Sequence, residues 1–557
     1  MYYAYTSASV GTVGVRPGVS MAISLFRSRK LAVIAGKVFA AVLTTAAIAS
    51  FAFYTHQLFL KYPPVWPDES LFANGAINLL HQRALATSLL SGVVPGIEHR
   101  TYLMPPVYYC YLTCVFSIWG LSIFAVRLAS LAAALLVMGL TYSLGLRSGL
   151  GPWLSLIPVS LLAVDSVFLR AGLIGRMDLV ALAFILLALR LSLGRDCPRA
   201  FPINHSGSST YFPAAPFLTG LACALASLTH PIGVVAVVGV VAAWTQLGTA
   251  QRWPVLVRML AGFSLPMLVW GVYIIQDPES FIVQFGSQLM RKAGRHPGTL
   301  ARLMENLVLN FGQWGLAQEL MGLLWVCGLG GLYLAARRRS ELLVLSATQL
   351  VILAAILWSK EIWYPVYLAP LTALGLGLLL AAEEPWGLRK TSLHAWPHRH
   401  ARPLAKEPWH LGNACLPCLA LSVSMLFARG NVRRLVQINA LQNKIYRTGT
   451  NYIAFCKDIS AVIPPGSRTL ISVIPDPYLE LAKRPDLALR EFVPEGFPVD
   501  RGQYRRYLAA SDYVVAGLPG APSVEVSEFL QLNGELVATV GQDDGIGYYA
   551  RIYRVKR

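Results

Sequence analysis

The chain has 557 residues, of which 55% are hydrophobic and only 13% are charged, and its net charge is +19. This composition excludes an ordinary soluble domain. The basic residues are scattered through short loops between apolar stretches, which indicates cytoplasmic anchors and contacts with membrane lipids rather than a nucleic-acid surface. We therefore expect an α-helical polytopic membrane protein without a nucleic-acid partner.

The apolar stretches predict a series of membrane spans. The first extends from about residue 31 to residue 60; it is longer than a signal-peptide core and lacks a cleavage site, so we expect a span preceded by a cytoplasmic segment 1–30. Ten further apolar helices are expected near 123–146, 151–168, 178–194, 213–230, 231–248, 256–275, 314–336, 341–358, 362–382 and 411–428. Most arginines and lysines between them fall in loops that this order places in the cytoplasm, as the positive-inside rule requires. The transmembrane domain is thus predicted over 31–428, with about 11 spans.

Two segments differ from this pattern. Residues 103–120 are apolar but too few to cross a bilayer comfortably, and we expect a re-entrant or interfacial helix. Residues 429–557 contain short β-rich runs at 469–474, 513–515, 536–540 and 548–555, separated by Pro and Gly turns. We expect a small soluble α/β domain there, on the extracytoplasmic side.

An acidic pair, Asp68–Glu69, follows the first span directly. Carboxylates at a membrane surface cost solvation energy unless water, a metal or a substrate meets them. A further acid, Asp178, opens another predicted span, shortly after Arg170 and Arg176. The alternative is that the acids only cap helix N-termini, where Asp is favoured.

The predicted topology places these acids on the same outer face as several basic residues. His230 and Lys360 end two spans there, and the loop 276–313 carries Arg291 and Arg295 against the positive-inside trend. Guanidinium and ammonium groups on this face suit an anionic headgroup, although a solvated or lipid-facing patch explains the loop equally well.

Acids and cations on one face suit the transfer of a group from a lipid phosphate. A carboxylate takes the proton of an attacking hydroxyl, and cations stabilise the departing phosphate. Close carboxylates also bind hard cations, so Asp68 and Asp178 are candidate ligands for a divalent metal, Mg or Mn. No other cofactor is expected. The sequence contains no Gly-rich phosphate loop, which argues against a nucleotide donor.

Five motifs in order carry a family resemblance: WPDES, YLMPPVYYCYLTCVFSIWG, FAVRLASL, VFLRAGLIGRMDLVALAFILLAL and LASLTHPIGVV. Together they resemble the protein O-mannosyltransferase and lipid A aminoarabinose transferase superfamily, family 39-like glycosyltransferases with the GT-C fold. The likeness covers roughly residues 60–250, with a weaker match at WSKEIWYPVYLAP. It implies inverting transfer of a hexosyl or pentosyl group from a polyprenyl-phosphate sugar to an acceptor on the non-cytoplasmic face.

The resemblance also assigns residues. Asp68, Glu69 and Asp178 match the family's acids, and are the expected catalytic residues. Donor phosphate or substrate contacts are implied for Arg170, Arg176 and Tyr108. Met104 and His230 stand where the family has lysines, so the remaining expected donor contacts are His230 and the substitutes Arg291, Arg295 and Lys360.

The acceptor cannot be read from these motifs, and a protein, a lipid and a glycan all fit. The style of the sequence suggests a bacterial inner membrane, with the site facing out of the cytoplasm; an endomembrane location would give the same sidedness. Two other classes stay open, a transporter or flippase of a lipid-linked saccharide and an inactive relative that serves as an assembly partner. The acids lie in loops rather than on broken helices, and no internal repeat is visible, which favours the enzyme.

Overall fold

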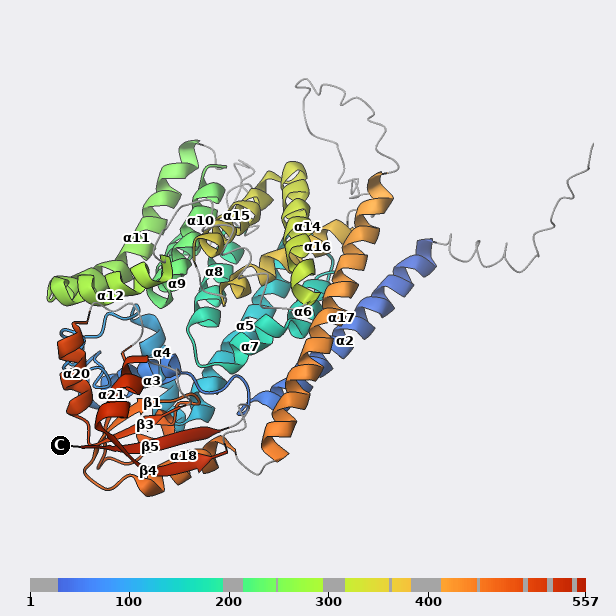
Figure 1. The fold of residues 1–557 in the computed structure, drawn as a ribbon. Helices are drawn as coiled ribbons and strands as arrows, with labels where there is room; N and C mark the ends of the chain where they lie inside the picture. The colour runs from blue at the N-terminus through green and yellow to red at the C-terminus, as the bar shows by residue number, and fades with distance from the viewer. Residues whose placement is uncertain are drawn as a thin grey trace, which may run out of the picture.

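The computed structural model describes residues 29–193, 214–246, 249–293, 316–359, 363–381, 412–447, 451–493, 499–517, 524–542 and 548–556. The predicted cytoplasmic segment 1–30 lies almost wholly outside them. Figure 1 shows a helical bundle with a small sheet at one end.

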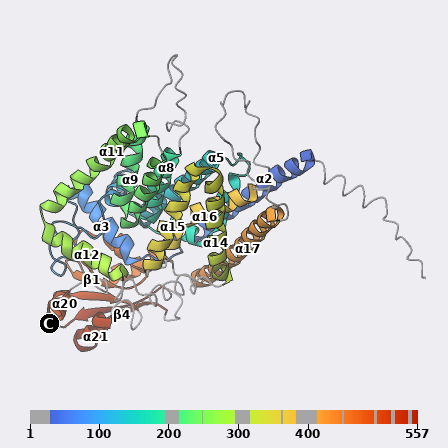
Figure 2. The ribbon, with the colours of Figure 1, turned by 90° about the horizontal axis from the view of Figure 1, so that it is seen from above.

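The first half of the bundle contains α2 (Arg29–Leu58), α3 (Pro67–Gln82), α4 (Val107–Trp119), α5 (Ile123–Arg147), α6 (Leu156–Val164), α7 (Ser166–Leu173), α8 (Asp178–Ser192) and α9 (Ala215–Thr229). The second half contains η2 (Pro231–Val234), α10 (Val235–Trp244), α11 (Thr249–Ile275), α12 (Pro278–Ala293), α14 (Leu316–Arg338), η3 (Ser340–Leu342), α15 (Leu343–Trp358), η4 (Tyr364–Tyr367), α16 (Ala369–Leu380) and α17 (Gly412–Arg447). Helices α2 and α17 run along one side of the bundle, and α11 and α12 lie on the opposite side (Figure 2).

By length and hydropathy, two of the described helices suffice to cross a membrane, Ile123–Arg147 and Arg252–Ile275, and a bent helix pair makes a third candidate. Five shorter apolar helices or helix pairs accompany them, of 10 to 17 residues each. The count of eleven spans therefore stays a prediction. Helix α4 has 13 residues and reaches about 20 Å, less than the hydrocarbon thickness, which fits the expected re-entrant or interfacial helix.

The single continuous helix expected at 151–168 is broken into two. Helices α6 and α7 meet there at 71°. The break falls at Asp165, whose extended backbone ends α6 and whose carboxylate accepts hydrogen bonds from the backbone N–H groups of Val167 and Phe168, at 2.8 and 3.4 Å. Asp165 is an N-cap residue inside the apolar run, so a new helix begins there although the hydropathy is continuous.

The last predicted helix is longer than expected. Residues 411–428 correspond to only the first half of α17, which continues as one helix of 36 residues to Arg447. Its second half carries alternating basic and apolar residues that hydropathy alone does not assign to a span.

The C-terminal region forms a five-stranded sheet with four helices. Its strands are β1 (Arg468–Ser472), β2 (Ala488–Glu491), β3 (Tyr513–Ala516), β4 (Gly534–Gly541) and β5 (Tyr549–Val555), and its helices are α18 (Tyr452–Val462), α19 (Tyr478–Leu481), α20 (Arg501–Ala509) and α21 (Val524–Asn533). The order is β2-β1-β3-β5-β4; β1 pairs in parallel with β2 and β3, and β5 pairs antiparallel with β3 and β4. The four expected strands are present, and β2 is an addition.

This sheet packs on the segments around α3. The backbone N–H of Asp476 donates to the Val65 carbonyl oxygen at 2.9 Å, and that of Glu491 donates to the Leu89 carbonyl oxygen at 2.9 Å. The Asn74 amide of α3 donates to the Tyr478 hydroxyl at 2.8 Å. These contacts fix α3 and the α3–α4 loop (residues 83–106) against the sheet.

Candidate functional site

One guanidinium joins the two acids that the sequence analysis selected. Arg176 lies just before α8 and donates through Nη1 to Asp68, in the first turn of α3, and through Nε to Asp178 Oδ2 at 3.0 Å. Both acids stand at helix N-termini, where the helix dipole favours negative charge. The structure thus brings together three predicted site residues, although Asp68 lies 108 positions before Arg176 in the sequence.

The two carboxylates differ in access. The Asp68 side chain is 28% exposed, whereas those of Arg176 and Asp178 are 7% and 5% exposed. Asp68 is therefore the more accessible of the two acids, and Asp178 lies behind the guanidinium. A guanidinium held from both sides has a fixed orientation, which in turn fixes the Asp68 carboxylate.

Glu69 occupies a different environment from its neighbour. It is fully buried, and its carboxylate accepts hydrogen bonds from the backbone N–H groups of Trp66 at 3.1 Å and Gly175 at 2.8 Å. Arg127 of α5, also fully buried, lies 3.5 Å from it. A Cβ at Gly175 would collide with Glu69 and Val126, so this position needs glycine. Glu69 thus caps α3 and ties it to α5 and the Arg176 segment, with no oxygen open to a substrate.

A second group of polar side chains reaches Asp178 from η4. The Tyr367 hydroxyl donates to Asp178 Oδ1 at 3.2 Å. The neighbouring Tyr364 hydroxyl lies 3.2 Å from His230 Nε2, while His230 Nδ1 accepts from the Ile232 backbone N–H at 3.1 Å. His230 is 1% exposed, and its ring centre lies 5.9 Å from that of Tyr367. His230 is therefore connected to the acids through two tyrosines.

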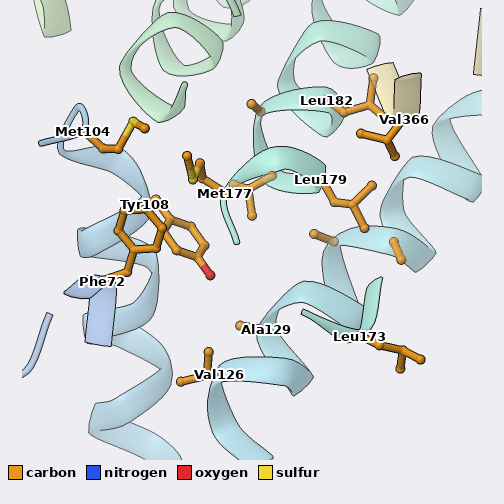
Figure 3. Close-up of a cluster of buried hydrophobic side chains, with 14 of the residues drawn as sticks. Phe72, Met104, Tyr108, Val126, Ala129, Leu173, Met177, Leu179, Leu182 and Val366 are labelled. Carbon is orange, nitrogen blue, oxygen red and sulfur yellow. The ribbon is translucent and has the colours of Figure 1, made fainter. Parts of the chain in front are cut away.

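Tyr108 lies on α4, and its fully buried ring meets Phe72 edge-on at 5.4 Å. Figure 3 shows the ring between Phe72 and Met177, with the hydroxyl directed toward α5. The hydroxyl interacts with the side chain of Ser130 in α5, the helix toward which it points.

The other predicted cations are distributed unevenly. The Arg170 guanidinium of α7 stacks on the Trp363 ring at 3.4 Å, which holds it beside η4. Arg291 falls in α12, although its side chain is not described, and Arg295 and Lys360 lie outside the described residues. The structure therefore places Arg170, Arg176 and His230 around the acids and leaves the remaining three untested.

Asp68 and Asp178, as arranged here, do not fit the predicted divalent metal. The Arg176 guanidinium stands between the two carboxylates, where the ion would have to be. Among the described residues, no group of three or more His, Cys, Asp or Glu side chains is arranged to hold a metal. A metal at this place would have to displace the guanidinium.

An apolar cavity of about 210 Å³ borders this site. Its wall comes from the segment before α4, from η2, α10, α12, α15 and η4, and includes Met104, His230, Val235, Phe285, Trp358 and Tyr364. His230 and Tyr364 are thus shared between the cavity and the chain of contacts that leads to Asp178.

Two buried acids that the sequence analysis did not select lie on the other side of α3. Asp476, which follows β1, and Glu491 of β2 are both fully buried and lie next to each other. Burial raises the pKa of Asp476 to about 6, and burial together with the neighbouring Asp476 raises the pKa of Glu491 well above its usual value. Two such carboxyls are stable side by side when they share a proton.

Comparison with solved structures gives the fold. ArnT from Cupriavidus metallidurans, bound to undecaprenyl phosphate, superposes with a TM-score of 0.55 over 92% of this chain and 97% of that chain, at 16% identity. Its apo state gives 0.56 over 93% and 98%, at 15% identity. The chain has the GT-C fold. The fold class expected from the sequence motifs is confirmed at this level, and the low identity establishes nothing finer than the GT-C fold.

A weaker likeness exists to the archaeal oligosaccharyltransferase AglB from Archaeoglobus fulgidus, with a TM-score of 0.46 over 86% of this chain and 69% of that chain, at 12% identity. No protein-family model matches the chain, and no curated protein matches it in sequence. The GT-C fold therefore rests on the structural superposition with ArnT.

Sequence reasoning missed Arg127 and the η4 tyrosines. An arginine inside an apolar helix is costly unless it is paired, and that signal was available for Arg127 in FAVRLASL. Tyr364 and Tyr367 lie in WYPVY, at the start of a predicted span, where tyrosine is usually an interfacial residue. Only the fold shows that they face the acids.

Proposed function

We propose that the chain is an integral-membrane glycosyltransferase that uses a polyprenyl-phosphate-linked sugar. One observation carries the proposal: Asp68 is a partly exposed carboxylate held by Arg176, whose other side is held by the buried Asp178. A reactive acid with a fixed orientation and an open side is what a general base requires. The GT-C fold shared with ArnT, which was solved with undecaprenyl phosphate, agrees with such a donor.

In the proposed reaction Asp68 takes the proton of an acceptor hydroxyl as its oxygen attacks the anomeric carbon. The new carbon–oxygen bond forms while the bond between the anomeric carbon and the phosphate oxygen breaks. The electron pair leaves with the polyprenyl phosphate, and the configuration inverts. Arg170 is proposed to stabilise the charge that develops on the phosphate, and His230, whose Nδ1 accepts a backbone N–H, is proposed as a neutral hydrogen-bond donor through Nε2. Arg291, Arg295 and Lys360 are proposed as further contacts.

The apolar cavity is the proposed site of the first isoprene units of the donor. Its wall is almost entirely apolar, and its polar members, such as His230 and Tyr364, lie toward Asp178. A polyprenyl chain in the cavity would therefore present its phosphate to the basic groups and its sugar to Asp68. Glu69 and Asp178 are assigned positioning roles, because their oxygens are already engaged by the protein.

The proposal includes the sidedness and location that the topology predicts. The site would face the non-cytoplasmic side of a bacterial inner membrane, and the acceptor would be a protein, lipid or glycan hydroxyl on that side. The transmembrane domain 31–428 and the extracytoplasmic domain 429–557 are proposed on the same basis.

The test is transfer by the purified protein from a panel of radiolabelled polyprenyl-phosphate sugars, with source membrane extract as acceptor. Asp68→Asn should reduce transfer by about 10²–10⁴-fold, the usual contribution of a general base. Glu98→Gln, an exposed acid of the α3–α4 loop, is the matched control and should leave the rate unchanged. Near-normal transfer by folded Asp68→Asn would contradict the assigned base. Donor binding without transfer from any sugar would favour a transporter or an inactive partner.

A further inference from the structure

A cleft lies between the α3–α4 loop and helix α20. It measures about 350 Å³ and is lined by Ser91 and Gly92 of the loop and by Arg490, Gln503, Arg506 and Tyr507 of the sheet region. None of these residues takes part in the Asp68–Arg176–Asp178 contacts. The cleft is therefore a feature separate from the proposed catalytic site.

The walls of the cleft are held in place by hydrogen bonds between them. The Tyr507 hydroxyl donates to the Leu89 carbonyl oxygen at 2.7 Å, and the Gln503 amide donates to that of Gly92 at 3.4 Å. Gly92 has a φ of +79°, in the left-handed region that favours glycine, and a Cβ there would meet nothing within 4 Å. The rim of the cleft is thus bare backbone on a fixed loop.

Two guanidinium groups give the cleft its charge. Arg490 stacks over the Tyr507 ring at 5.0 Å and donates one hydrogen bond, through Nη1, to the Tyr507 carbonyl oxygen at 3.1 Å. A guanidinium has five N–H donors, so other N–H groups of Arg490 remain to bind a ligand in the cleft. Arg506 is exposed on α20. Within the described ranges, neither guanidinium forms an ion pair with a carboxylate, and no acid lines the cleft.

We propose that this cleft binds a phosphate monoester dianion. Two guanidiniums from different elements match two negative charges, and their planar forks match the several terminal oxygens of a phosphate. The Gln503 side chain borders the same space. A lipid headgroup and a phosphorylated soluble molecule both present this group, and the cleft recognises what they share.

The experiment compares two neighbouring arginines of α20 in the full-length protein. Arg506→Gln removes a guanidinium that lines the cleft, and Arg505→Gln removes an equally exposed one that does not. Inorganic phosphate is titrated onto detergent-solubilised protein, and hydrogen–deuterium exchange of α20 is followed. In parallel, exchange is measured in nanodiscs of phosphatidylcholine with and without phosphatidic acid, whose headgroup is a phosphate monoester.

We expect saturable slowing of exchange at α20 in the wild type and in Arg505→Gln, and at least a tenfold weaker effect in Arg506→Gln. Arg490→Lys, which keeps the charge but loses the fork, should also weaken binding. Slowing by inorganic phosphate identifies a soluble ligand as sufficient, and slowing only with phosphatidic acid identifies the headgroup. Equal loss in the two glutamine variants, or no slowing with either probe, overturns the proposal. Because the readout is binding, such a failure leaves the proposed transfer reaction untouched.

Discussion

The buried pair Asp476–Glu491 predicts that the sheet region loosens as the pH rises. Both carboxyls have a folded-state pKa raised above the usual value, so the folded sheet holds more protons than the opened one. Their contribution to stability is therefore present at low pH and is lost as the pH rises through the folded pKa. For Asp476, the rise from 3.8 to about 6 corresponds to about 3 kcal/mol, lost between about pH 4 and pH 6, and Glu491 continues the loss at higher pH.

Replacing Glu491 with glutamine should weaken this dependence on pH. The amide has nearly the same shape as the carboxyl and carries a permanent donor, so it can bond to the Asp476 carboxylate without a shared proton. A hydrogen bond to a charged group contributes about 1.5–3 kcal/mol. At pH 8 Glu491→Gln should therefore open less often than the wild type, and its stability should vary less with pH.

Hydrogen–deuterium exchange of β1 and β2 between pH 5 and pH 8, corrected for the intrinsic rates, measures this opening. At pH 8 we expect exchange in Glu491→Gln to be about tenfold slower than in the wild type, since about 1.4 kcal/mol is a factor of ten. Glu528→Gln removes an exposed acid of α21 and should keep the wild-type profile. Parallel pH profiles for wild type and Glu491→Gln, or faster opening of the variant at pH 8, would refute the shared proton.

Two further predictions concern the site. Tyr367→Phe removes the hydroxyl that donates to Asp178. The loss of one hydrogen bond of about 1 kcal/mol should lower the transfer rate roughly fivefold, with an unchanged melting temperature. An unaltered rate would show that this contact does not position Asp178. Arg127→Met leaves the Glu69 carboxylate buried without its cation, which should lower the free energy of unfolding by about 3–5 kcal/mol. Size-exclusion profiles should therefore show aggregated rather than monodisperse protein. Wild-type behaviour would contradict the pairing.

The sequence predicted the charged residues of the site, but not the roles that depend on contacts between distant segments. Asp68, Arg176 and Asp178 were selected because charged residues are scarce in an apolar chain and stand out at span ends. The distinction between Asp68 and Glu69 was not available, because adjacent residues on a helix point in different directions and only the neighbours decide their roles. The Arg127 and Gly175 contacts that close off Glu69 come from segments about 60 and 106 positions away.

The fold was likewise predictable in part: hydropathy located the helices but not their bends and extensions. Most span boundaries follow from hydropathy and lie within a few residues of the observed helices, as in α5 and α8. The bend at Asp165 and the length of α17 depend on a local cap and on packing, which hydropathy does not report. Strand β2 has only four residues, too few for a periodic pattern to be recognised, yet it carries Glu491.

These contacts give the sheet region a role in holding helix α3, which carries Asp68. The helix is bound on one side by Glu69, through Arg127 and Gly175. On its other side Asn74 bonds to Tyr478, and the chain just before α3 bonds to Asp476 through Val65. Asp476 therefore connects the buried acid pair directly to the start of α3. Opening of the sheet would release one of the two sides that orient Asp68, so a change in the protonation of the pair should change transfer without touching any residue of the Arg176 bridge.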